Sequence, residues 1–164
     1  MQTTVARRVT SLPPRKKLSV GDVSQVARPV LGADMPVALF RVVRLIAMED
    51  ILGRSVGSML YNAGEKIGLS LDVASPAELV NLIEALKIGK VEVVEASAHR
   101  VVADVYECVT CSGLERVGYT ICHFEAGLVA GALTKITRGS VFVKETRCIG
   151  GLGDPMCRME ATIK

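Results

Sequence analysis

The feature that most constrains the fold is a change in the period of apolar residues near residue 90. Before it, apolar residues such as Leu39, Ile46 and Ile51 recur at helical spacings, with charged residues between them. After it, the valine-rich stretches 91–95 and 100–108 alternate in the manner of strands. Residues 119–136 return to the helical period, and 140–146 and 157–163 alternate again. The sequence therefore predicts an α+β fold in which helices pack on a mostly antiparallel sheet.

Helix boundaries in the first half are marked by glycine, serine and proline. A helix is predicted from Pro36 to an interruption at Gly53, and a second one over residues 54–69. Ser75 and Pro76 predict the start of a third helix, because serine caps a helix and proline suits its first position. We expect this helix to stop near Gly89.

The first 34 residues differ in character from the rest. Basic residues flank a Pro-Pro pair, at Arg7, Arg8, Arg15, Lys16 and Lys17. We predict an N-terminal arm over residues 1–34, solvated or wrapped on a partner, with one short helical turn around residues 23–27. A single domain is expected over residues 35–164, in keeping with the length of the chain.

Composition excludes several classes of protein. Aromatic residues make up only 4% of the chain, so few side chains could stack on nucleic-acid bases, and the net charge of +3 is small. No run of about 18 uncharged apolar residues is present, despite a mean hydropathy of +0.37, and no signal peptide is visible. We expect a cytoplasmic protein that binds neither membrane nor nucleic acid directly.

The densest chemistry lies in the last third of the chain. Five cysteines in a chain without a secretory signal favour metal binding or buried thiols over disulfides. Cys148 and Cys157 flank a glycine-rich loop that joins two predicted strands, so they should lie close together. Glu145 is one strand step further back, and Cys122 on the preceding helix could supply a fourth ligand. Such a set would close a tetrahedral zinc site, and the alternative is a group of buried, packing thiols.

A second pair, Cys108 and Cys111, has the C-x-x-C spacing of redox and zinc motifs. It ends a predicted strand instead of opening a helix, which is poor context for a thioredoxin-like redox site. A metal site that uses His123 is also conceivable. We favour structural thiols for Cys108 and Cys111.

Several stretches together resemble the 4-vinyl reductase domain family over residues 28–163. They are LFRVVRLIAMEDILG and MLYNAGEKIG, then YECVTCSGLERVGYTICHFEAGLVAGAL and FVKETRCIGGLGDPMCRME. The family includes sensor domains of activators that detect phenol or toluene, and a protein linked to reduction of a bacteriochlorophyll vinyl group. The resemblance implies a ligand-binding fold shared with a subunit of a vesicle-trafficking tether.

The resemblance also implies a site. The zinc ligands of the aromatic sensors match Cys122, Glu145, Cys148 and Cys157, although the final loop is one residue longer here. The pocket is expected beside the zinc, at Met59, Phe124, Ala126 and Val143. The aromatic and histidine residues that contact phenol in the sensors have no evident match. No ATPase or DNA-binding domain is attached, so the chain is not expected to be an activator of that kind.

We therefore predict a regulatory module that binds or senses a small apolar ligand, forms a homodimer and contains structural zinc. One alternative is a reductase for a vinyl or tetrapyrrole-type substrate, although glycines 150–153 lack the G-x-G-x-x-G spacing and no catalytic residue stands out. The other is a dimeric scaffold that pairs through the helices from Pro36 to Leu69. Gly127 and Gly131 lie four apart, which permits the close approach of a strand or a ligand to their helix.

Overall fold

The computed structural model describes residues 18–31 and 34–164. The chain divides after Ala33 into two units. In the first unit, helix α1 spans Val20–Ser24 and begins at a capping box formed by Ser19 and Asp22, slightly earlier than the turn predicted at 23–27. Most of the predicted arm, residues 1–17 with 32 and 33, lies outside the described residues, and its role stays a prediction.

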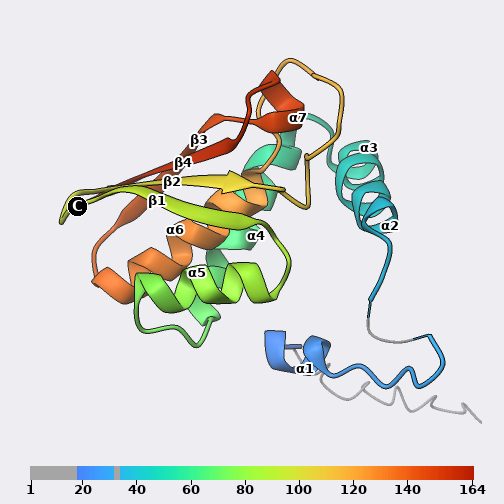
Figure 1. Cartoon of the computed structure of the whole chain (residues 1–164), viewed down its shortest axis with the longest axis horizontal. Coiled ribbons are helices and arrows are strands. Elements are labelled where there is room, and N and C mark those ends of the chain that lie inside the picture. The colour runs from blue at the N-terminus through green and yellow to red at the C-terminus, as the bar shows by residue number, and fades with distance from the viewer. Residues whose placement is uncertain (1–17, 32–33) are drawn as a thin grey trace, which may run out of the picture. The chain divides into compact units, whose positions relative to one another are not determined.

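The second unit, Asp34–Lys164, contains a four-stranded sheet in the order β1-β2-β4-β3. The strands are β1 (Lys90–Ala96), β2 (Arg100–Tyr106), β3 (Val141–Arg147) and β4 (Cys157–Ile163). Each neighbouring pair is antiparallel. Helices α5 (Pro76–Ala85) and α6 (His123–Thr137) pack on one face of the sheet, and α4 (Val56–Ser70) packs on α6 (Figure 1). The predicted α+β fold with an antiparallel sheet is therefore confirmed.

One face of the sheet supplies the core because side chains alternate along each strand. In β3, Val141, Val143 and Glu145 are buried, while Phe142 and Lys144 are exposed. In β4, Cys157 and Met159 point to the same buried side. The alternation thus carries one carboxylate and one thiol into the interior at neighbouring ends of β3 and β4.

Helices α4 and α6 touch backbone to backbone. A Cβ atom on Gly127 or Gly131 would overlap the carbonyl oxygen of Tyr61 or Glu65, and one on Gly64 would overlap that of Phe124. Glycine is required at these positions because any side chain would push the helices apart. The close approach anticipated for Gly127 and Gly131 is therefore made by a helix, and not by a strand.

The segment from Val37 to Leu52 is helical throughout but not uniform. It consists of α2 (Val37–Arg41), a π-helical turn η1 (Val42–Ala47) and α3 (Met48–Leu52). Gly53, with a φ of 55°, ends it as predicted, and the 3₁₀ turn η2 (Gly53–Ser55) leads into α4. Within residues 18–31 and 34–164, every helix is too short or too polar to cross a membrane.

Three predicted boundaries differ from the structure. Helix α6 begins at His123 and not at Tyr119, because the N–H groups of Val117 and Gly118 donate to the carbonyls of Gly150 and Gly151. Strand β2 ends at Tyr106 because the next residue has a positive φ, and α5 ends at Ala85 for a similar reason at Lys87. The loop predicted over 149–156 contains the short helix α7 (Ile149–Leu152).

Candidate metal centre and the adjoining groove

All five cysteines are buried at one end of the sheet. They come from separate segments: Cys108 and Cys111 from the turn after β2, Cys122 from the residue before α6, Cys148 from the start of α7, and Cys157 from the start of β4. No disulfide joins any of them. Segments far apart in the sequence therefore deliver their thiols to one place.

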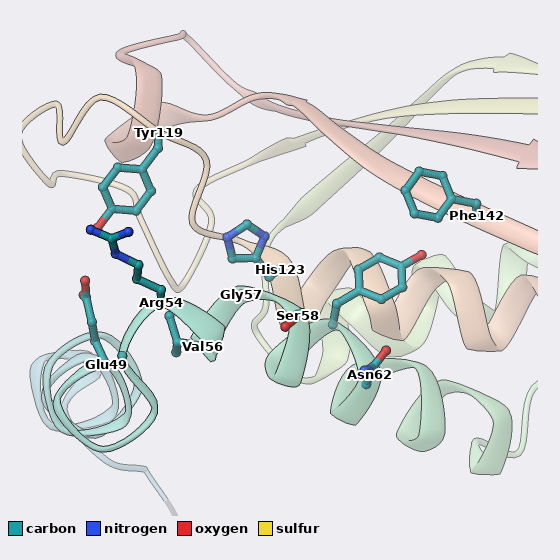
Figure 2. Close-up of a pocket in the computed structure, with 11 residues that line it drawn as sticks. Glu49, Arg54, Val56, Gly57, Ser58, Asn62, Tyr119, His123 and Phe142 are labelled. Carbon is teal, nitrogen blue, oxygen red and sulfur yellow. The ribbon is translucent and has the colours of Figure 1, made fainter.

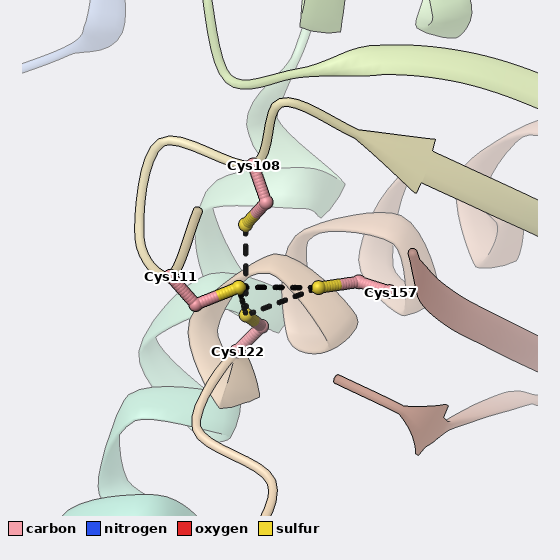
Figure 3. Close-up of side chains that lie close together, drawn as sticks. All are labelled: Cys108, Cys111, Cys122 and Cys157. Carbon is pink, nitrogen blue, oxygen red and sulfur yellow. Dashed lines mark hydrogen bonds between the residues drawn. The ribbon is translucent and has the colours of Figure 1, made fainter. Parts of the chain in front are cut away.

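Four of the sulfur atoms form a compact tetrad (Figure 3). The Sγ atom of Cys122 lies 3.6 Å from that of Cys108 and 3.6 Å from that of Cys111. The Sγ atom of Cys157 lies 3.2 Å from that of Cys111 and 4.0 Å from that of Cys122. A tetrahedron with a metal ion about 2.3 Å from each sulfur has edges of about 3.8 Å. These separations fit a thiolate-bound metal ion.

A second tetrad consists of Cys122, Glu145, Cys148 and Cys157, whose ligand atoms all lie within 4.8 Å of one another. The Oε2 atom of Glu145 accepts a hydrogen bond of 2.9 Å from the backbone N–H of Cys122. Its Oε1 atom is buried without a partner among residues 18–31 and 34–164. A buried oxygen with no donor is costly, whereas a cation beside it would satisfy it. The residues present therefore fit a metal ion here as well.

The acid–base properties of the cluster show how strongly its members interact. Hydrogen bonds from neighbouring thiols, first from Cys111, hold the pKa of Cys108 and Cys148 below the ordinary thiol value. The hydrogen bond with Cys108 raises the pKa of Cys111 to about 12. Burial raises the pKa of Glu145 to about 8. Without a cation, the cluster cannot ionise all of its ligands together.

Two arginines connect the cluster to the helical segment Val37–Leu52. Arg41 donates hydrogen bonds of 2.8 Å to the carbonyls of Val109 and Ser112, so it clamps the C-x-x-C turn. The buried Arg44 donates a 3.2 Å hydrogen bond to Glu125, which in turn accepts one of 2.7 Å from Thr110. The turn that presents Cys108 and Cys111 is therefore held in place by side chains.

Glycines in α7 allow it to approach the segment that precedes α6. A Cβ atom on Gly151 would overlap the carbonyl oxygen of Tyr119, and one on Gly150 would lie 2.6 Å from that of Cys111. The N–H of Gly151 also donates to the Sγ atom of Cys148 at 3.3 Å. The glycine-rich loop thus packs against the cluster and supports a thiol within it.

A groove of about 890 Å³ lies beside the cluster. Its lining combines aromatic, aliphatic and polar residues: Glu49, Gly53, Arg54, Val56, Gly57, Ser58, Tyr61, Asn62, Tyr119, His123 and Phe142. In Figure 2 the ring of His123 stands between Tyr119 and Phe142. A smaller cavity of about 150 Å³ shares Tyr119 and His123 with the groove and extends toward Arg44. Because His123 directly follows Cys122, the groove and the cluster share a stretch of backbone.

His123 is the polar group closest in sequence to the cluster. Burial lowers its pKa, with a further lowering from the charge of Arg44, so the imidazole stays neutral near pH 7. Gly57 accommodates the ring, because a Cβ atom there would lie 3.0 Å from it. A neutral imidazole can donate or accept one hydrogen bond to a bound molecule.

The predicted site residues are distributed as follows. Cys122, Glu145, Cys148 and Cys157 come together in the second tetrad. The four residues predicted for the ligand pocket do not line the groove or the smaller cavity. They are Met59, exposed on α4, Phe124, whose ring lies under the guanidinium of Arg44, and Ala126 and Val143, both in the core.

Cys108 and Cys111 are the residues that sequence reasoning undervalued, since it assigned them to packing alone. The structure places both in a potential ligand set. Their C-x-x-C spacing was the available signal, because a tight turn with this spacing directs both thiols to one point. The spacing could not show that the turn lies against Cys122 and Cys157.

The comparisons with known proteins agree with this arrangement. The sequence model of the 4-vinyl reductase domain matches residues 101–163. An uncharacterized protein of Methanocaldococcus jannaschii, MJ1642, is 32% identical over 133 residues, which cover 81% of each chain. This chain belongs to the 4-vinyl reductase domain family.

Solved structures with the same fold include a vinyl-4-reductase family protein from M. jannaschii (TM-score 0.59, 21% identity, 82% of this chain and 85% of that chain). The phenol-responsive sensory domain of the transcription activator PoxR is similar over 79% of this chain and 75% of its own (TM-score 0.60, 14% identity). A trafficking protein particle complex subunit 3 from Naegleria fowleri, covalently bound to palmitic acid, is similar over 78% of this chain and 95% of its own (TM-score 0.58, 14% identity). The fold predicted from the family resemblance is thus confirmed.

The buried pair of Arg44 and Glu125 leads to a pH-dependent prediction. Replacing Arg44 by Met leaves Glu125 buried without its cation, which typically costs about 3–5 kcal/mol of unfolding free energy. Burial already raises the pKa of Glu125, and Arg44 opposes that rise, so Arg44→Met should raise the pKa further. Between the ordinary pKa and the raised one, the folded variant binds more protons than the unfolded chain, so its stability falls as pH rises.

Urea unfolding at pH 6 and pH 8 measures this effect. The loss caused by Arg44→Met should be greater at pH 8 than at pH 6. The double variant Arg44→Met/Glu125→Gln, which has no carboxylate to titrate, should lose the added pH dependence. An equal loss at both pH values in the single variant would show that Arg44 does not compensate the Glu125 charge.

Proposed function

We propose that this chain is a regulatory small-molecule-binding module that contains a structural zinc ion. The observation that carries the proposal is the shared backbone of groove and cluster, where His123 of the groove follows the candidate ligand Cys122. Ligand pockets are typically concave, largely apolar and equipped with a few polar groups, as this groove is. The likeness of the fold to a phenol-responsive sensory domain supports the same function.

The candidate metal ligands are Cys122, Glu145, Cys148 and Cys157. Thiolates together with a carboxylate suit zinc, and four protein ligands leave no open coordination position for catalysis. When bound, zinc would tie together the start of α6, the end of β3 and the start of β4. A structural role for the metal therefore favours a binding module over a reductase.

The ligand that the groove suits has an apolar body and at least one polar group. Tyr61, Tyr119 and Phe142 are three of the six tyrosine and phenylalanine residues of the chain, so its scarce aromatic surface is concentrated here. The ring centroids of Tyr61 and Phe142 lie 5.8 Å apart. Polar groups of Glu49, Arg54 and His123 occupy the other part of the groove (Figure 2).

Loss of one proposed zinc ligand should lower both metal content and stability. We expect Cys148→Ala to weaken zinc binding by at least about tenfold, since even residues behind the ligands typically contribute 10–100-fold. Zinc content by mass spectrometry and thermal unfolding with and without a chelator measure the effect. Ser112→Ala, which removes a buried hydroxyl beside Cys111, is the matched control and should retain zinc. Unchanged zinc content and melting in Cys148→Ala would remove it from the ligand set.

Filling the groove should block ligand binding. Ser58 lines the groove and is exposed, and its neighbour Met59 is exposed on α4 without lining it. We expect Ser58→Trp to weaken binding of phenol, used as a small probe, by at least about tenfold, and Met59→Trp to leave it unchanged, since one buried aromatic contact contributes about 1–3 kcal/mol.

Chemical-shift changes at the amides of Gly57 and His123 during a phenol titration report the binding. The native chain has no tryptophan, so each variant also gains a single fluorophore. Loss of binding in Met59→Trp alone would place the pocket where the sequence resemblance predicted it. A native protein that shows no response at these amides would contradict binding of this probe class in the groove.

We further propose that the module is a homodimer. On the segment Val37–Leu52, Leu39, Val42, Val43 and Ile46 are 49–57% exposed, at helical spacing. Arg41 and Arg44 on the same segment bind the rest of the domain, so the apolar row is left uncovered. A second copy that presents the same row would cover it in a two-fold arrangement.

Light scattering coupled to gel filtration tests the dimer. Ile46→Glu should convert the dimer to a monomer at micromolar concentration, because it would bury a charge in the contact. Val94→Glu on β1, where valine is 53% exposed, is the matched control and should remain dimeric. A monomeric native chain would exclude this proposal.

A further inference from the structure

We propose that the cluster binds two metal ions, bridged by the thiolates of Cys122 and Cys157. This inference rests on the proposed metal centre and extends it to Cys108 and Cys111. The two tetrads already described have Cys122 and Cys157 in common. Together they contain six ligands, which are five thiols and one carboxylate.

The distribution of the six ligands matches a pair of four-coordinate ions. One ion would take Cys108 and Cys111 as its own ligands, and the other would take Glu145 and Cys148. Each would complete its set with the two shared thiolates. A thiolate sulfur has enough lone pairs to bind two metal ions at once, and zinc is tetrahedral in structural sites.

Each half of the cluster has its own sign of an absent cation. On one side, the sulfur separations of 3.2–4.0 Å approach the edge of about 3.8 Å expected around a single ion. On the other side, Oε1 of Glu145 is buried without a partner in the described part of the chain. An ion in the sulfur tetrad alone would leave this oxygen unsatisfied, and an ion in the other tetrad alone would leave Cys108 and Cys111 without a ligand role.

Charge favours the same count. Five thiolates and one carboxylate would carry six negative charges in a buried region, and a single divalent ion compensates only two of them. Two divalent ions compensate four. The N–H groups of Gly151 and Cys122, which donate to Cys148 and Glu145, stabilise part of the remainder.

The C-x-x-C turn is built to hold its thiols in position. Arg41 fixes it through the carbonyls of Val109 and Ser112, and Thr110 between the two cysteines is tied to Glu125. Cys108 and Cys111 are 2% and 0% exposed. Preorganised buried thiols of this kind are typical of ligands with a supporting outer shell.

Native mass spectrometry of the untagged chain, saturated with zinc and desalted without chelator, tests the inference. We expect two zinc ions per chain. Cys108→Ser/Cys111→Ser should retain one, Glu145→Gln/Cys148→Ser should retain one, and Ser112→Ala should retain two. One ion in the native chain would overturn the two-ion inference and leave the proposed structural zinc intact. A chain without any ion would overturn both.

Cobalt(II) titration of the native chain gives a second readout that does not depend on any variant folding. Thiolate-to-cobalt absorption should rise up to two equivalents. The EPR signal per cobalt should fall as the second equivalent binds, because ions joined by bridging thiolates couple magnetically. Saturation at one equivalent, or two ions whose EPR signals simply add, would contradict the bridged pair.

Discussion

The structure depends on the meeting of five thiols and one carboxylate at the end of the sheet. The turn after β2, the start of α6, the end of β3 with α7, and the start of β4 all converge there. These segments have few aliphatic side chains of their own to bury at that point, and a set of buried thiols can hold them only when its charges are compensated. A bound metal would replace the missing hydrophobic contacts with coordination bonds, which need little volume.

The surrounding polar network sets the position of the cluster relative to the helices. Arg41 binds backbone carbonyls, Arg44 binds Glu125, and Glu125 binds Thr110, so each buried polar group has its contact on a different segment. Hydrogen bonds of this kind are directional, unlike hydrophobic contacts. They explain why the segment Val37–Leu52 keeps a defined place while much of its apolar surface stays exposed.

The sequence predicted the fold well because the two hydrophobic periods are distinct, and the alternation of β3 placed Glu145 on the buried side. The gathering of Cys122, Glu145, Cys148 and Cys157 was anticipated through family resemblance more than through spacing. The role of Cys108 and Cys111 and the location of the groove were not anticipated. Both depend on contacts between distant segments, such as the packing of Gly57 against His123, which leave no local pattern in the chain.

The glycine contact between α4 and α6 has a consequence for how the two sites communicate. Side chains between helices normally form a soft layer that absorbs small displacements, but here the backbones of Gly64 and Gly127 touch those of the facing helix directly. Helix α4 carries one wall of the groove, and α6 begins immediately after Cys122. A molecule that displaces α4 must therefore carry α6 with it as one stiff body, and the first strain it creates falls on the thiol at the head of that helix.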